Sequence, residues 1–142
     1  MTYRISLLFF LLSLFYYDQA RAQTRIIDSL KEKVVLAGSA NDRLNAILLL
    51  CEERQSLHAD TLSYYASIAK RLASDLGDPS RSALAGYFIA SSLSRNGKLE
   101  EAMDMSDENL EGLNWRSNKN AYVKFSLLKG QLLIKGGKYK ES

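Results

Sequence analysis

The feature that most constrains the fold of this 142-residue chain is an internal repeat with a period of 40 residues. The phrase "NGKLEEAM" begins at Asn96, and "GGKYKES" begins at Gly136. A shift of 40 positions superposes residues of similar character: Leu50, Ala90 and Gly130; Ile47, Tyr87 and Leu127; Leu48, Phe88 and Leu128; Gly97 and Gly137. A repeat of this length is typically one supersecondary unit that buries its apolar face against neighbouring units.

The apolar residues within one unit follow helical rather than alternating spacing, which predicts two amphipathic helices. The two stripes are Ala83, Leu84, Tyr87, Phe88, Ala90 and Leu93, and then Leu99, Ala102, Met103, Leu110 and Leu113. Gly97 lies between them, where a glycine can close a helix in the left-handed conformation without a Cβ clash. The unit is therefore predicted to be a helix, a tight turn and a second helix.

Turn signals elsewhere agree with this phase. The stretch "LGDPS" predicts a helix end at Gly77 and a new helix with Asp78 as N-cap and Pro79 at its first position. The polar stretches "AGSAND" and "LNWRSNKN" predict two further linkers. We expect an all-α fold of about six helices without strands: a capping helix over 24–37, units over 43–82 and 83–122, and an incomplete unit over 123–142.

The repeated phrases resemble the tetratricopeptide repeat. That pattern has a small residue seven positions before a turn glycine, an aromatic residue two positions after it, and an alanine three positions further on. The corresponding residues are Ala90, Gly97, Leu99 and Ala102 in the second unit and Gly130, Gly137, Tyr139 and Ser142 in the third; the first unit matches poorly, with Leu50, Leu57, Ala59 and Leu62. The resemblance implies a solenoid of helical hairpins, although the period is longer than the usual 34 residues.

The first 22 residues have the three parts of a secretory signal peptide. Arg4 precedes the apolar run from Ile5 to Tyr17, and "ARA" ends at Ala22. The 13 residues of this run are fewer than the roughly 20 that cross a bilayer, so cleavage before Gln23 is favoured over a membrane anchor. We therefore expect residues 23–142 to be exported, with the periplasm as their location.

Catalytic chemistry is not indicated. The single histidine, His58, lies at a predicted turn, and the single cysteine, Cys51, lies in an apolar helix where a buried thiol is expected. The acidic residues Glu100, Glu101, Asp104, Asp107 and Glu108 are interpreted as a solvated helix face, and Tyr64 and Tyr65 as packing residues. The 19 basic and 16 acidic residues are interspersed, which argues against nucleic-acid binding. We expect no enzyme activity, cofactor or metal.

A binding surface remains as the expected function. In tetratricopeptide arrays the first helix of each unit lines the concave side, where a protein or peptide partner binds. Transferring the helical phase to this chain gives six candidate groove residues: Tyr87, Ser91, Arg95, Lys124, Gln131 and Lys135. Arg95 and Lys135 lie one period apart and are expected to form a short basic row.

The long period and the apolar N-terminus resemble the exported repeat domains that precede a transmembrane helix and a kinase core in bacterial sensor histidine kinases. The chain is therefore expected to be a sensory or interaction domain from the N-terminal part of a membrane-bound signalling protein. The alternative is a stand-alone periplasmic adaptor without enzymatic activity. Phe125, Leu128, Leu132 and Leu133 are expected to stay partly exposed in the incomplete unit and to favour self-association through that end.

Overall fold

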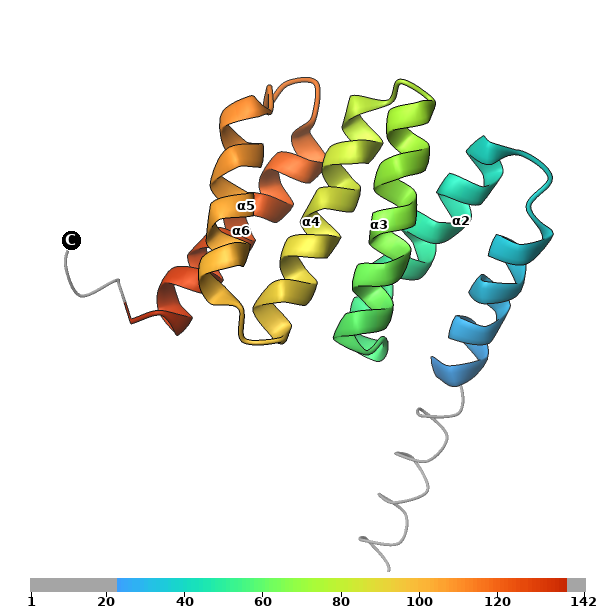
Figure 1. Cartoon of the computed structure of the whole chain (residues 1–142), viewed down its shortest axis with the longest axis horizontal. Helices are drawn as coiled ribbons and strands as arrows, with labels where there is room; N and C mark the ends of the chain where they lie inside the picture. Colours follow the sequence, from blue (N-terminus) through green and yellow to red (C-terminus); the bar gives the residue numbers. More distant parts are fainter. Residues whose placement is uncertain (1–22, 138–142) are drawn as a thin grey trace, which may run out of the picture.

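The computed structural model describes residues 23–137, and all regular secondary structure in that range is helical. The predicted signal peptide at 1–22 and the predicted repeat positions Tyr139 and Ser142 lie outside the described residues. Figure 1 shows a first helix over 23–36, followed by α2 (Ala40–Glu52), the 3-10 turn η1 (Arg54–Ser56), α3 (Ala59–Asp75), α4 (Pro79–Arg95), α5 (Leu99–Gly112) and α6 (Lys119–Lys135). The predicted all-α class, with six helices and no strand in this range, is confirmed.

The linker before α2 is shorter than expected. The repeat period predicts that the first unit starts at Arg43, but α2 begins at Ala40. The reason is a cap: the Ser39 hydroxyl accepts a hydrogen bond from the Asp42 backbone N–H at 3.0 Å. A serine in this position satisfies one of the free N–H groups of the first turn and so lets the helix begin earlier.

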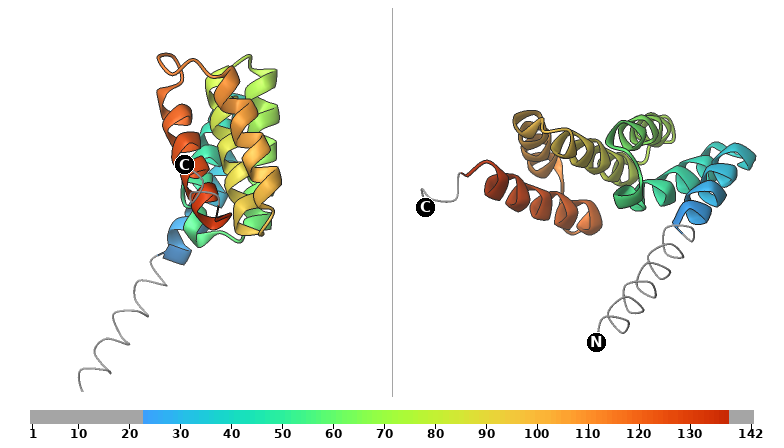
Figure 2. Two further views of the ribbon diagram at one scale, coloured as in Figure 1. Left: turned by 90° about the vertical axis from the view of Figure 1, so that its left-hand side faces the viewer. Right: turned by 90° about the horizontal axis from the view of Figure 1, so that it is seen from below.

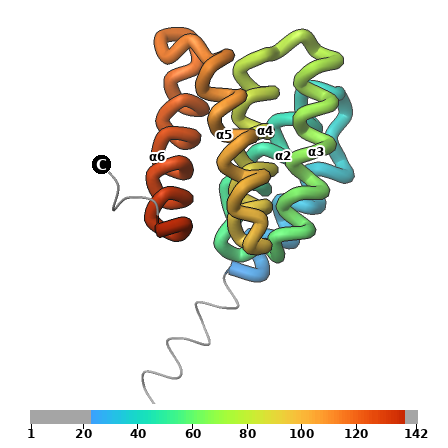
Figure 3. Tube along the Cα trace, turned by 60° about the vertical axis from the view of Figure 1, so that its left-hand side comes forward, coloured from blue at the N-terminus to red at the C-terminus, as the bar shows by residue number. Residues whose placement is uncertain are grey.

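From α2 to α6, each helix packs against the next one along the chain, and α4 also contacts α2 and α6. Figures 2 and 3 show the helices side by side, with α3 and α5 on one side of α4 and with α2 and α6 on the other. The end of α2 also lies next to α6, where Glu52 contacts Lys124 at 2.8 Å, although these two residues are 72 positions apart in the sequence. This arrangement creates the cavity described in the next subsection.

Small residues let the helices approach closely. Ala66, Ala69 and Ala73 form a fully buried row on α3, and Ala90 and Ala102 are fully buried on α4 and α5. Without long side chains between them, two helix backbones can pack at short range. Phe88 and Phe125 fill the larger spaces.

Cys51 is fully buried in α2, as predicted. Burial, helped by the negative charge of Glu52, raises the pKa of its thiol to about 12. The group is therefore a neutral packing residue at any physiological pH. Both tyrosines, Tyr64 and Tyr65, are interpreted from the sequence as packing residues. This is confirmed for Tyr65, which packs against the core. It is wrong for Tyr64, which is 63% exposed and contacts only the edge of the Tyr65 ring among the aromatic rings described.

The turn predicted between α3 and α4 is confirmed. Gly77 has a φ of 66°, Asp78 is the N-cap and Pro79 is the first residue of α4. The Asp78 carboxylate accepts from the Arg81 backbone N–H at 2.8 Å and from the Arg81 side chain at 2.7 Å. These two hydrogen bonds hold the pKa of Asp78 below its ordinary value, and the bond from the backbone N–H has the larger effect. The cap's stabilisation is fully present above the ordinary pKa and is lost as the pH falls through the lowered one.

Gly97 closes α4 with a φ of 79°, in the left-handed region. We expect Gly97→Val to lower the free energy of unfolding by about 1–2 kcal/mol, because a β-branched residue is disfavoured there. A Cβ at this position would meet no atom within 4 Å, so the cost comes from the backbone alone. The control is Gly112→Val, where the space is equally open and φ is not positive. Equal urea midpoints for the two variants would contradict the turn.

The expectation for α6 is wrong in its choice of face. Phe125, Leu128 and Leu132 are buried against the rest of the chain, and only Leu133 is partly exposed. The exposed apolar residues form a second face, which we call the outer face of α6 and which borders the cavity at Leu127: Val123, Leu127, Gly130 and Ile134. Because α6 carries apolar residues on both sides, the spacing did not show which side contacts α4.

Candidate functional site

The structure brings all six predicted groove residues into the lining of one cavity of about 400 Å³. Its walls are the end of α4, the length of α6 and the short η1 segment. The predicted residues in the lining are Tyr87, Ser91, Arg95, Lys124, Gln131 and Lys135, and the residues that the sequence analysis missed are Arg54, Gln55, Ser94, Leu127 and Leu128. The shared location is thus observed, whereas binding itself stays a prediction.

Several of these residues are related by the 40-residue period. Gln55, Arg95 and Lys135 are separated by 40 positions each, and so are Ser91 and Gln131. Residues one period apart thus line the same cavity. Gln55 could therefore have been predicted as a lining residue from the sequence, because it lies one period before Arg95.

Tyr87 contributes the aromatic part of the cavity. Its ring is buried and packs edge-on against Phe88 and Phe125, with ring centroids 5.2 and 5.8 Å away. The Arg54 guanidinium carbon lies 5.6 Å from the centroid of this ring, and the Lys124 ammonium lies 5.4 Å from it. A cation over an aromatic face is attracted by the ring quadrupole, so both charges are held in the cavity. Burial raises the pKa of Tyr87; Arg54 opposes this rise and Glu52 adds to it.

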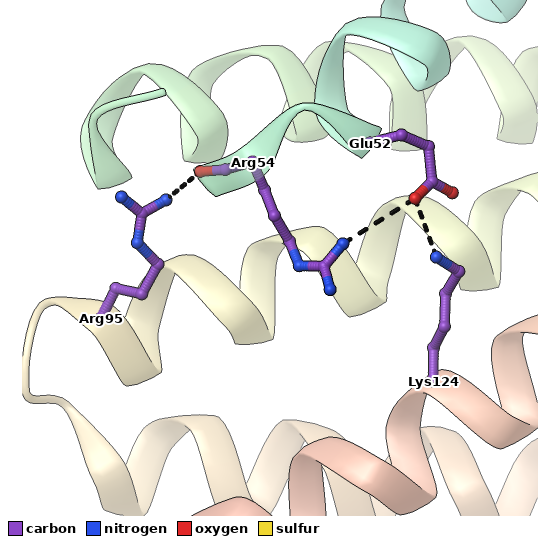
Figure 4. Close-up of polar contacts among 4 residues, drawn as sticks. All are labelled: Glu52, Arg54, Arg95 and Lys124. Carbon is purple, nitrogen blue, oxygen red and sulfur yellow. Dashed lines mark hydrogen bonds and ion pairs between the residues drawn. The ribbon is translucent and has the colours of Figure 1, made fainter. Parts of the chain in front are cut away.

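Glu52, at the end of α2, neutralises part of this charge. Its Oε2 atom lies 2.8 Å from the Lys124 ammonium and 3.8 Å from the Arg54 guanidinium (Figure 4). The ion pair with Lys124 joins α2 to α6, 72 positions apart in the sequence. No periodic pattern predicts it, because Lys124 corresponds to Leu84 in the preceding unit.

The predicted basic row of Arg95 and Lys135 is only partly realised. Both side chains line the cavity, but the Arg95 guanidinium donates to the backbone carbonyls of Arg54 and Leu57, as Figure 4 shows for the first of these. Arg95 therefore fixes the η1 segment to the end of α4. The Lys135 ammonium donates to the Ser94 hydroxyl at 3.3 Å, a long and weak contact.

The lining is cationic. Arg54, Arg95, Lys124 and Lys135 contribute four positive side chains, and the lining residues include no aspartate or glutamate. Glu52 is the carboxylate that contacts this set within the described residues. A concave surface with one sign of charge raises the local concentration of ligands of the opposite sign.

The other candidate groups lie elsewhere. His58 is exposed and precedes α3. Of the five acidic residues interpreted as a solvated face of α5, four are exposed, and the fifth, Asp107, pairs with Lys129 at 2.6 Å. Between residues 23 and 137, no three His, Cys, Asp or Glu side chains gather as metal ligands would. None of the helices in this part of the chain has the length and apolar character needed to span a bilayer.

No family model, curated protein or solved structure matches the chain.

Proposed function

We propose that this chain is a tetratricopeptide-like interaction or sensory module that binds a protein or peptide segment in the cavity between η1, α4 and α6. The observation that carries the proposal is the lining itself: side chains at equivalent positions of successive units converge on one concave site. The hairpin packing supports a solenoid arrangement, since α4 contacts both α2 and α6. The fully buried Ala90 and Ala102 occupy the positions where the repeat family has small residues.

The chemistry of the lining suits a polypeptide. The amide side chains of Gln55 and Gln131 each offer both donors and an acceptor, which matches the alternating groups of an extended backbone. Leu127 and Tyr87 add apolar contacts beside them. A cavity of about 400 Å³ is large enough for a few side chains of such a segment.

The direct test is a selection of displayed random peptides on the purified chain. Gln131→Trp places a large ring at the cavity wall from an exposed position, so the selected peptides should lose most of their binding to this variant. The matched control is Glu108→Trp on the exposed side of α5, which should bind like the parent chain. Peptides that bind both variants equally would place the interaction elsewhere and would remove the proposal.

The proposal includes export, for which the support is the three-part sequence of residues 1–22. We expect the exported protein to begin at Gln23, because "ARA" immediately precedes it. N-terminal sequencing of material from the periplasmic fraction tests this prediction. Material that begins at Met1 would favour an uncleaved anchor instead.

A sensory role for this module in a membrane-bound signalling protein, of the histidine-kinase type, is the most specific form of the proposal. Its support in the fold is the ion pair between Glu52 and the cavity residue Lys124, which links α2 to α6. A ligand that competes for either side chain would change how firmly these two helices are joined. Signal transduction needs this kind of coupling between an occupied site and the arrangement of helices.

A further inference from the structure

We infer that the ligand of this cavity is an acidic peptide segment, whose side-chain carboxylates bind the cations of the lining, and that Glu52 is an intrachain competitor for two of those cations. This inference rests on the proposed function and adds the chemical class of the ligand. Four cationic side chains face one contacting carboxylate in the described part of the site.

Glu52 shows that a carboxylate fits between Lys124 and Arg54. Both contacts involve the same oxygen atom, Oε2, and the one to Arg54 is long at 3.8 Å. A guanidinium binds a carboxylate best through two parallel hydrogen bonds to both oxygens, and this geometry is not used here. Arg54 therefore retains most of its capacity for a second carboxylate.

Lys135 is the least satisfied cation of the lining. Its contact among the described residues is the 3.3 Å hydrogen bond to the neutral Ser94 hydroxyl. Arg95, by contrast, is committed to two backbone carbonyls. A carboxylate of an incoming peptide can thus reach Lys135 without breaking an ion pair, whereas one that reaches Lys124 must compete with Glu52.

The shape of the site favours a peptide over a nucleic acid. A phosphate backbone is bound by a basic stripe that runs along the surface, and the net charge of +3 is spread over the chain. Here the cations are gathered in one cavity next to Leu127, Leu128 and the Tyr87 ring. This combination fits a segment in which acidic and apolar side chains alternate.

The experiment uses three fluorescein-labelled six-residue peptides and fluorescence anisotropy at low salt. The acidic peptide alternates leucine and glutamate and is amidated; the neutral peptide has glutamine for glutamate; the third is the neutral peptide with a free terminal carboxylate. We expect the acidic peptide to bind at least tenfold more tightly than the other two. Its affinity should fall steeply as salt is raised, because exposed charge interactions are screened.

Two variants test the assigned cations. Glu52→Gln removes the competing charge and should tighten binding of the acidic peptide about five- to tenfold, whereas Lys135→Gln should weaken it at least fivefold. The matched controls, Glu108→Gln on α5 and Lys70→Gln on α3, remove the same charges from exposed positions outside the lining and should change the affinity less than twofold. Circular dichroism of each variant checks that the helices are intact.

The tightening by Glu52→Gln is the decisive result, because a merely structural role for Glu52 would weaken binding. Unchanged or weaker binding in that variant would overturn the inference, and so would equal binding of the neutral peptide or binding that needs only the free terminal carboxylate. Tighter binding of a single-stranded oligonucleotide would overturn it as well. A further outcome is that selected peptides bind the parent chain without charge dependence and fail to bind the Gln131→Trp variant. That result would overturn the acidic class of the ligand and leave the proposed peptide binding intact, so failure of the inference and failure of the proposed function are distinguishable.

Discussion

Replacing Phe125 with alanine should lower the free energy of unfolding by about 3–5 kcal/mol, the usual range for a fully buried phenylalanine in a packed core. Phe125 has no exposed surface, and its ring meets the Tyr87 ring edge-on at 5.8 Å. A Cβ placed on Gly86 would lie 3.7 Å from the tip of the same ring, which shows how closely α4 and α6 approach there. The melting temperature should fall by about 10 °C or more.

The matched control is Leu127→Ala, two positions further along α6. Leu127 is 64% exposed, so its truncation removes little buried surface and should cost less than about 1 kcal/mol. Urea denaturation followed by circular dichroism at 222 nm measures both variants. A cost for Phe125→Ala no larger than that of Leu127→Ala would mean that α6 does not pack on α4 through this face.

This stability prediction has a consequence for the candidate site. The Tyr87 ring is held between Phe88 and Phe125, and two cations of the cavity lie over it. The cavity is therefore built directly on the contact between α4 and α6. Helix packing and the position of the cationic side chains depend on the same aromatic residues.

Local signals explain what could be predicted from the sequence. The turns at Gly77 and Gly97, the N-cap at Asp78 and the first position of α4 at Pro79 were all predicted correctly. Each depends on the backbone preference of a single residue, which needs no knowledge of the tertiary structure. The six groove candidates came together in one cavity because the period carries the helix phase from one unit to the next.

Contacts between distant segments explain what could not be predicted. The first unit ends its helix α2 at Glu52 and continues as η1, and Arg95 stabilises η1 from 41 positions away by donating to the Arg54 carbonyl. Glu52 itself finds its partner on α6. Periodicity describes one helix at a time, so it does not reveal a bond between helices at non-equivalent positions.

The face of α6 that contacts α4 was also not predictable, because apolar residues lie on both sides of this helix. The residues one period earlier than Val123, Leu127, Gly130 and Ile134 are Ala83, Tyr87, Ala90 and Ser94, and all four are buried. The outer face of α6 is thus exposed at positions whose equivalents in α4 are buried. A Cβ on Gly130 would meet no described atom within 4 Å, so there is room beside it for side chains of another helix.

We therefore expect the purified chain to self-associate through the outer face of α6, and the double variant Val123→Lys/Ile134→Lys to weaken this association at least tenfold in sedimentation equilibrium. The two residues are 46% and 63% exposed, so the lysines should hardly change the free energy of unfolding, but each would place a charge in an apolar contact. Neither residue lines the cavity, so peptide binding should persist. The control is Val35→Lys/Leu36→Lys, which removes an exposed apolar pair, 81% and 72% exposed, from the first helix. If this control variant dissociates as readily, association is a general property of exposed apolar residues; if the parent chain is monomeric at all concentrations, the outer face of α6 does not bind a second copy.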